Sequence, residues 1–132
     1  MTEKLMPTAL KCGSEIMHIY NTDFSVEEKA DKSPVTEADT ISESIIIDHL
    51  GELTPSIPIV AEEQFSRMGP PDFQGTTFWC VDALDGTKEF IKRNGNFTVN
   101  IGLLVNGQPA LGVIYAPAHG KLYTGINCMK TD

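Results

Sequence analysis

The sequence predicts an α+β fold, in which two helices pack on a largely antiparallel sheet. Apolar residues recur at helical spacing in residues 4–21 and again in residues 37–50. Large apolar side chains then recur at every second position from Phe97 to Val105, the period of a half-buried strand. Asn106-Gly107 follows at once and is a strong hairpin signal, so the next strand is expected to return antiparallel.

The two helices are predicted from the spacing of their apolar residues. In the first, the apolar positions are Leu5, Ala9, Cys12, Ile16 and Tyr20. The second is preceded by Thr36 to Asp39, which has the T-x-x-D form of a capping box, and its apolar face is expected at Ile41, Ile45 and Leu50. The polar residues 27–33 between the helices predict a loop or a hairpin tip.

The strands are predicted from short apolar runs. Residues 57–61 form one such run and are followed by Glu62-Glu63, and residues 77–81 form another and are followed by Asp82. Residues 68–75 hold two prolines and two glycines, which predicts a loop. After the hairpin, residues 110–115 are expected to pair with residues 97–105, and residues 122–124 add a further strand.

Composition bounds the class of protein. A chain of 132 residues with 41% hydrophobic and 21% charged residues fits one domain with a buried core. No apolar run is long enough to span a bilayer, and the first residues lack the order of a secretory signal, so we expect a cytoplasmic protein. The net charge of -8 argues against a nucleic acid polymer as partner but allows a small phosphorylated ligand at a cation-loaded site.

Cysteine and histidine give no metal motif. Cys12, Cys80 and Cys128 are odd in number and widely spaced, so we expect free thiols, with Cys80 inside a strand. The histidines are scattered and predict surface or helix-face positions: His18, His49 and His119.

Acidic residues border the ends of two predicted strands. Asp82 closes one strand, and Asp85 follows three residues later in a turn completed by Gly86. Two carboxylates on a tight turn, together with the Leu84 carbonyl, form a set of hard oxygen ligands that suits Mg²⁺, and Glu62 at the end of a neighbouring strand could reach the same cation. Each feature also has a simpler explanation, namely a D-G turn, solvated surface glutamates, and an Asp39 that only caps its helix.

A phosphate cradle is predicted beside these acids. Residues 87–90 read as the start of a helix with Asp85 as its N-cap. The backbone N–H groups of Gly86 and Thr87 would then be free to hold a phosphate oxygen. A metal cluster that faces such a cradle is suited to metal-assisted phosphate hydrolysis.

The sequence resembles the inositol monophosphatase superfamily at these residues. The family signature W-x-x-D-P-(I or L)-D-G-T stands here as residues 79–87, with Ala83 in place of the proline. Residues 33–39 and 61–63 match two further family blocks, and the resemblance covers nearly the whole chain. The continuation in residues 88–93 and 97–101 looks like the branch of 3′(2′),5′-bisphosphate nucleotidases.

The resemblance implies roles for individual residues. Glu62, Asp82, the Leu84 carbonyl and Asp85 would bind metal, with two or three Mg²⁺ ions in the complete family site. Thr87 together with Glu62 would position and activate the attacking water, and the N–H groups of Gly86 and Thr87 would hold the phosphate. Asp39 would anchor an additional metal or its water, and Lys32 would lie near the phosphate.

The implied reaction is Mg²⁺-dependent hydrolysis of adenosine 3′,5′-bisphosphate, or a sulfated relative, to AMP and phosphate, with sensitivity to lithium and a place in sulfur metabolism. Two alternatives stay open: a truncated, catalytically incomplete metal- and phosphate-binding remnant, and an inositol monophosphatase. Family members are expected to be longer, so we expect residues 1–132 to form a single metal-binding phosphatase domain without the C-terminal substrate-binding domain. That would expose an apolar sheet face, which a homodimer could cover.

Overall fold

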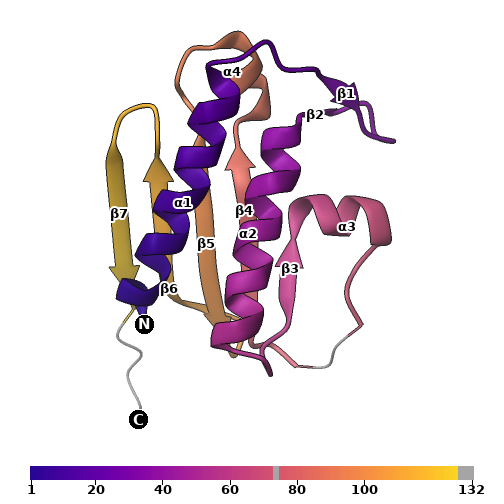
Figure 1. The fold of residues 1–132 in the computed structure, drawn as a ribbon. Helices are drawn as coiled ribbons and strands as arrows, with labels where there is room; N and C mark the ends of the chain where they lie inside the picture. The colour runs from indigo at the N-terminus through magenta and orange to yellow at the C-terminus, as the bar shows by residue number, and fades with distance from the viewer. Residues whose placement is uncertain (73–74, 128–132) are drawn as a thin grey trace.

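Two long helices cover one face of a five-stranded sheet in the computed structural model, which describes residues 1–72 and 75–127 (Figure 1). Helix α1 spans Thr2–Tyr20 and helix α2 spans Glu37–Leu53. Both lie close to their predicted ranges. The α+β class predicted from the sequence is therefore confirmed.

The sheet has the strand order β3-β4-β5-β6-β7. Its strands are β3 (Ile59–Ala61), β4 (Phe78–Asp85), β5 (Thr98–Val105), β6 (Gln108–Ala116) and β7 (Lys121–Ile126). Strands β3 and β4 run parallel, and all the other pairs are antiparallel. The predicted hairpin joins β5 to β6, where Asn106 and Gly107 both have positive φ, as a two-residue type I′ turn requires.

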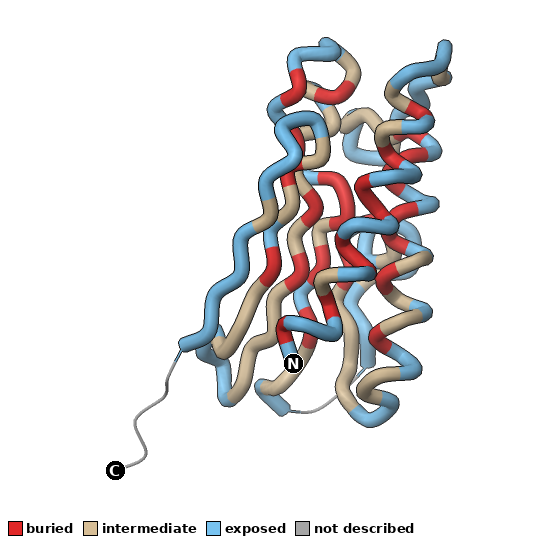
Figure 2. Tube along the Cα trace, turned by 60° about the vertical axis from the view of Figure 1, so that its left-hand side comes forward, coloured by how far each residue is buried: buried red, intermediate tan, exposed pale blue. Residues whose placement is uncertain are grey.

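The core lies between the helices and the sheet (Figure 2). The predicted apolar stripe of α1 is confirmed at Leu5, Ala9, Cys12 and Ile16, which are fully buried. Trp79 in β4 is also fully buried, and its indole N–H donates to the Thr54 hydroxyl at the end of α2, 2.9 Å away. This hydrogen bond links the end of α2 to β4, the second strand in the sheet.

The predicted apolar face of α2 is partly wrong. Ile41 is exposed and Ile45 is half-buried, whereas Ile46 and Leu50 are fully buried. The stripe that faces the sheet is polar in its first half, with Asp39, Ser42 and Glu43 as buried members. Because the prediction counted only apolar residues, it placed the buried face in the wrong direction at this end of the helix.

Four short elements surround the top of the sheet in Figure 1. Strands β1 (Glu27–Glu28) and β2 (Pro34–Val35) form an antiparallel hairpin, which confirms the predicted hairpin tip. Helix α3 (Glu62–Met68) was not predicted, because it is short and its Phe65 and Met68 are exposed, so it carries no apolar stripe. Helix α4 spans Thr87–Lys92.

Neither long helix covers the other face of the sheet (Figure 2). A row of residues without large side chains crosses that face in register from β4 to β7: Cys80, Gly102, Gly112 and Gly125. Ile114 and Tyr123 pair beside this row and are 44% and 56% exposed. Within the described ranges, no helix is both long and apolar enough to cross a membrane.

Candidate metal and phosphate site

The predicted site residues meet where the parallel strands β3 and β4 end. Because the two strands run in the same direction, the acids that follow β3 and those at the end of β4 lie at one edge of the sheet. A pocket of about 280 Å³ opens there, and its lining includes every predicted site residue except Asp39 and Lys32. These residues are Glu62, Asp82, Leu84, Asp85, Gly86 and Thr87.

Strand β4 continues further than predicted. It runs through Asp82 to Asp85 instead of ending at Val81, and its pairing with β5 shifts register between the two aspartates. Such an irregularity re-aims side chains at the end of a strand. Both aspartates therefore line the pocket from one strand rather than from a strand end and a separate turn.

Gly86 sets the turn into helix α4. The prediction of Asp85 as N-cap is wrong, because Gly86 occupies that position with φ of 92°. A Cβ on Gly86 would lie 2.9 Å from the Asn96 carbonyl oxygen, so both the backbone angle and the space favour glycine. The N–H groups of Gly86 and Thr87 lie at the start of α4, where a helix offers its first N–H groups no internal acceptor.

Asp39 stands behind the pocket wall and holds Thr87. It is 1% exposed, and its Oδ1 accepts a 2.7 Å hydrogen bond from the Thr87 hydroxyl. Its Oδ2 accepts from the Thr36 N–H at 2.7 Å and from the Thr36 hydroxyl at 2.8 Å, which confirms the predicted capping box. Burial raises the pKa of Asp39, and the hydrogen bonds from Thr87 and Thr36 act in the opposite direction.

Asp82 is the strongly perturbed acid of the pocket. Burial, a hydrogen bond with Glu62 and repulsion from Glu62 and Asp85 raise the pKa of Asp82 to about 8, against a lowering by the Leu84 N–H. Two carboxylates so close to a third, partly buried one disfavour its ionised form. The same crowding of negative charge attracts a cation.

The donor atoms of the pocket fit Mg²⁺ in kind. They are carboxylate oxygens and one backbone carbonyl, the hard ligands that this ion prefers, and the pocket leaves room for water and phosphate. In residues 1–72 and 75–127, no three acidic, histidine or cysteine side chains are already grouped closely enough to hold an ion. The Glu62 side chain is 50% exposed and already shares a hydrogen bond with Asp82.

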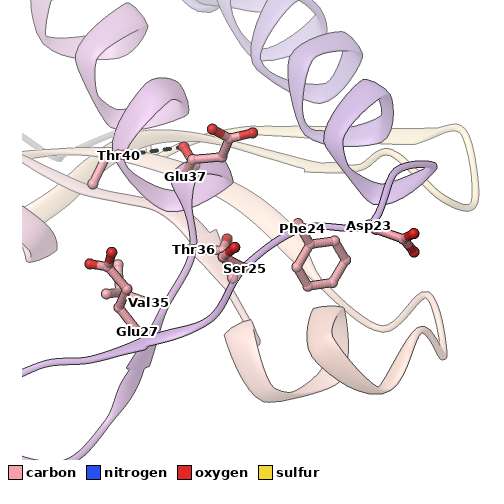
Figure 3. Close-up of a pocket in the computed structure, with 8 residues that line it drawn as sticks. All are labelled: Asp23, Phe24, Ser25, Glu27, Val35, Thr36, Glu37 and Thr40. Atoms are coloured by element: carbon pink, nitrogen blue, oxygen red, sulfur yellow. Dashed lines mark hydrogen bonds between the residues drawn. The ribbon is translucent and has the colours of Figure 1, made fainter.

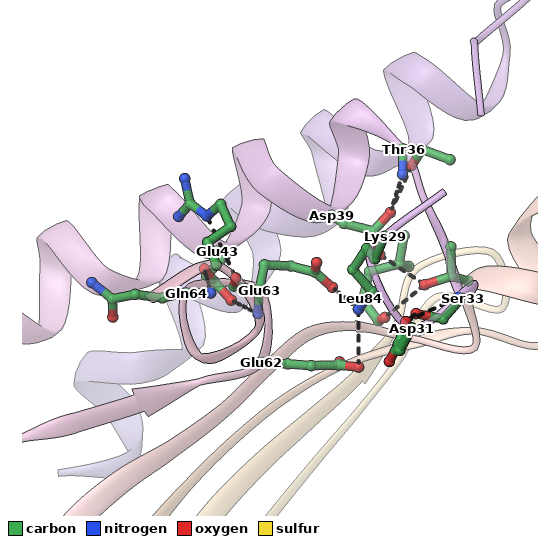
Figure 4. Close-up of polar contacts among 12 residues, drawn as sticks. Lys29, Asp31, Ser33, Thr36, Asp39, Glu43, Glu62, Glu63, Gln64 and Leu84 are labelled. Carbon is green, nitrogen blue, oxygen red and sulfur yellow. Dashed lines mark hydrogen bonds and ion pairs between the residues drawn. The ribbon is translucent and has the colours of Figure 1, made fainter. Parts of the chain in front are cut away.

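Two ionic residues of the site were not predicted. Lys29 lines the pocket and pairs with Glu62 and Glu63, whereas Lys32, the predicted lysine, is exposed and is not among the lining residues (Figure 4). Glu43 from α2 accepts hydrogen bonds from the N–H groups of Glu63 and Gln64 at 2.7 and 3.0 Å. It thereby caps α3 and fixes the helix that begins with Glu62.

A larger cavity, of about 510 Å³, lies beside the start of α2 (Figure 3). Asp23, Phe24 and Glu27 line it from the segment after α1, and Thr36 and Glu37 line it from the other side. It contains none of the predicted metal ligands. The chemistry of the lining therefore singles out the smaller pocket, even though it has less volume.

The cysteine and histidine predictions can be placed in the structure. Cys12 is buried and Cys80 is exposed, and both are free thiols, with Cys80 inside β4 as predicted. Cys128 lies outside the described residues. His18 and His119 are exposed, and His49 on α2 shares a hydrogen bond with Thr8 on α1, so none of the histidines lines the pocket.

Comparison with known proteins identifies the family. The model of the inositol monophosphatase family matches residues 1–131, and the chain belongs to this family, whose members are metal-dependent phosphomonoesterases. The chain is 45% identical over 130 residues to the 3′(2′),5′-bisphosphate nucleotidase CysQ of Escherichia coli O6:H1, covering 94% of this chain and 51% of that protein.

Solved structures share the fold. The crystal structure of CysQ from Bacteroides thetaiotaomicron is 44% identical with a TM-score of 0.75, covering 94% of this chain and 45% of that one. The extragenic suppressor protein suhB from Bartonella henselae is 27% identical with a TM-score of 0.81, covering 95% of this chain and 48% of that one. This chain thus spans about half the length of the relatives it matches.

Proposed function

We propose that the protein acts as a Mg²⁺-dependent phosphatase of the 3′(2′),5′-bisphosphate nucleotidase type. The observation that carries the proposal is the single pocket in which Glu62, Asp82 and Asp85 face Gly86 and Thr87. Identity of 44–45% to CysQ proteins supports this branch of the family. The substrate is a small phosphorylated nucleotide, adenosine 3′,5′-bisphosphate, which yields AMP and phosphate in the cytoplasm.

Thr87 and Asp39 would orient the attacking water. The Thr87 hydroxyl donates its proton to Asp39 at 2.7 Å, so its lone pairs are left to accept a hydrogen bond from water in the pocket. Glu62 accepts the other proton of that water from the opposite side. Water would then attack phosphorus in line as Glu62 takes up its proton, the ester bond from phosphorus to the 3′-oxygen would break, and the leaving 3′-oxygen would take a proton from solvent water.

The remaining residues would bind the phosphate and the cofactor. The N–H groups of Gly86 and Thr87 hold a phosphoryl oxygen. Glu62, Asp82, Asp85 and the Leu84 carbonyl would hold Mg²⁺, whose chemistry when bound is to acidify water and to stabilise the leaving oxygen. Lithium would inhibit by competing at this oxygen site.

A second candidate is a metal- and phosphate-binding unit that lacks catalysis on its own. One observation favours it: the described residues group no three ligands for an ion. A magnesium site with few protein ligands loses affinity when one is missing. In this case the domain would need further ligands, from a C-terminal domain or a partner chain.

Phosphate release from adenosine 3′,5′-bisphosphate by the purified chain tests the proposal. It should require Mg²⁺, fall in the presence of Li⁺, and fall at least about a hundredfold in Asp82→Asn, which removes a ligand and its charge. Inositol 1-phosphate serves as the competing substrate. If folded protein binds Mg²⁺ but releases no phosphate from either compound, the binding-unit candidate replaces the enzyme.

A further inference from the structure

In the described part of the chain, Lys29 is the residue of the β1–β2 hairpin that forms ion pairs with acidic side chains at the pocket. Its Nζ lies 3.2 Å from Glu63 Oε1 and 3.8 Å from Glu62 Oε1, and its side chain is only 13% exposed (Figure 4). Residues 1–72 and 75–127 contain two ion pairs between side chains, and Lys29 makes both of them. The ammonium group therefore sits against a predicted metal ligand.

The hairpin fixes Lys29 in this place. The Lys29 N–H donates to the Ser33 carbonyl at 2.8 Å, and its carbonyl accepts from the Lys32 N–H at 2.9 Å. Asp31 Oδ1 accepts a 3.0 Å hydrogen bond from the Ser33 N–H and closes the turn. The backbone at Lys29 is thus held on both sides, and its side chain extends over the start of α3.

The two carboxylates hold the ammonium unequally. Glu63 is buried and lies within hydrogen-bonding distance, so losing this contact would leave a charge unpaired in the protein. Glu62 is half exposed and lies beyond hydrogen-bonding distance, so its pair with Lys29 is weak and easily exchanged. Lys29 can therefore stay on Glu63 while Glu62 moves away.

We propose that Lys29 is a positioning residue that competes with the divalent cation for Glu62. In the cation-free protein its ammonium pairs with Glu62 and Glu63 together, while Glu62 also shares a hydrogen bond with Asp82. Cation binding requires Glu62 to leave Lys29, because two positive charges cannot share one carboxylate without repulsion. This inference rests on the proposed function, since it takes the pocket as a cation site.

Calorimetric titration with Mg²⁺ tests the competition without any measurement of activity. Lys29→Gln keeps an amide donor for Glu63 but removes the charge, so we expect Mg²⁺ to bind about threefold to tenfold more tightly than in the wild type. Lys32→Gln is the matched control: it removes the same charge from the same hairpin at an exposed position, and the affinity should stay within about twofold. Lys29→Arg keeps the charge and should also stay close to the wild type.

Side-chain NMR of the wild type provides a readout that does not depend on a variant folding. The Lys29 side-chain resonances should move during the Mg²⁺ titration with the dissociation constant found by calorimetry, while those of Lys32 stay still. Unchanged or weaker Mg²⁺ binding in Lys29→Gln, or Lys29 resonances that stay still while Mg²⁺ binds, would overturn the competition and leave the proposed function standing. Absence of Mg²⁺ binding in both proteins would overturn the two together.

Discussion

Three acidic side chains near the pocket are buried, and each depends on a small number of named partners. Asp39 relies on Thr36 and Thr87, Glu63 relies on Lys29, and Glu43 relies on two backbone N–H groups of α3. A buried carboxylate that loses its partners costs about 3–5 kcal/mol when it stays ionised. The site is therefore most sensitive at the residues that support the predicted ligands.

Glu43 gives a prediction about pH. Burial raises the pKa of Glu43 in the folded protein, against the lowering by the N–H groups of Glu63 and Gln64. The unfolded chain ionises Glu43 at about pH 4.3, so its contribution to stability is complete below that pH and is lost as the pH rises through the folded pKa.

The free energy of unfolding of the wild type, relative to Glu43→Gln, should therefore be higher at about pH 4 than at about pH 7. Urea denaturation of both proteins at the two pH values measures this difference in the free energy of unfolding. The other titratable groups contribute equally to both proteins, so their contributions cancel. A difference that is equal or larger at the higher pH would contradict the raised pKa.

Gly86 gives a prediction about backbone strain. An alanine would adopt φ near 92° at a cost and would place its Cβ 2.9 Å from the Asn96 carbonyl oxygen. We expect Gly86→Ala to lower the free energy of unfolding by about 1–3 kcal/mol, measured in urea. Gly51→Ala in α2, where a Cβ meets nothing within 4 Å, is the control and should stabilise slightly. An equal effect of the two substitutions would refute the strain at Gly86.

The sequence predicts the positions of the acidic pocket residues better than those of the residues that contact them. Glu62, Asp82 and Asp85 could be predicted to converge because each follows or borders the end of a predicted apolar strand. The parallel pairing of β3 and β4, which brings these acids to one edge of the sheet, came only from the structure. Lys29 and Glu43 could not, because their partners lie 34 and 20 residues away in sequence. Neither residue belongs to a local pattern, so only the packed structure shows its role.

At the scale of elements, α2 joins the core to the site. Its second half buries Ile46 and Leu50 against the sheet, and its first half presents Asp39 and Glu43 to the pocket region. The long elements followed from apolar periodicity, apart from the direction of this one face. The short helices α3 and α4 depend instead on caps supplied by Glu43 and Gly86, which periodicity does not report.

The buried face of α2 can be tested with two isoleucines of the same helix. Ile46 is fully buried and Ile41 is 38% exposed. Ile46→Ala removes core contacts and leaves a cavity, so it should lower the free energy of unfolding by about 2–5 kcal/mol. Ile41→Ala should change it by less than about 1 kcal/mol, because Ile41 is already 38% exposed and loses fewer buried contacts. Denaturation curves of the two variants measure both changes. Similar losses of the free energy of unfolding would support the buried face predicted from the sequence.

At the scale of the whole molecule, the two faces of the sheet differ. One is covered by α1 and α2, and the other presents Ile114 and Tyr123 beside the row from Cys80 to Gly125 (Figure 2). A Cβ at Gly125 would meet nothing within 4 Å, so contacts inside this chain do not require a glycine there. Exposed apolar surface of this kind favours association.

We therefore expect concentration-dependent self-association through the uncovered face, consistent with the homodimer considered from the sequence. Ile114→Lys places a charge at its centre and should shift the protein toward the monomer in sedimentation velocity experiments. Leu10→Lys is the matched control, since Leu10 is 46% exposed but lies on α1, on the covered side. A wild type that stays monomeric at every concentration, or equal effects of both variants, would count against this surface.

The row across the uncovered face also contains a cysteine that can be labelled chemically. Cys80 is exposed on the strand that carries Asp82, whereas burial raises the pKa of the Cys12 thiol to about 12 and keeps it unreactive. With Cys128 replaced by serine, a maleimide fluorophore would label Cys80 selectively. The dye would then stand two residues from a carboxylate of the pocket and on the surface open to association. The fluorescence of one dye would thus report both cation binding in the pocket and self-association through the uncovered face of the sheet.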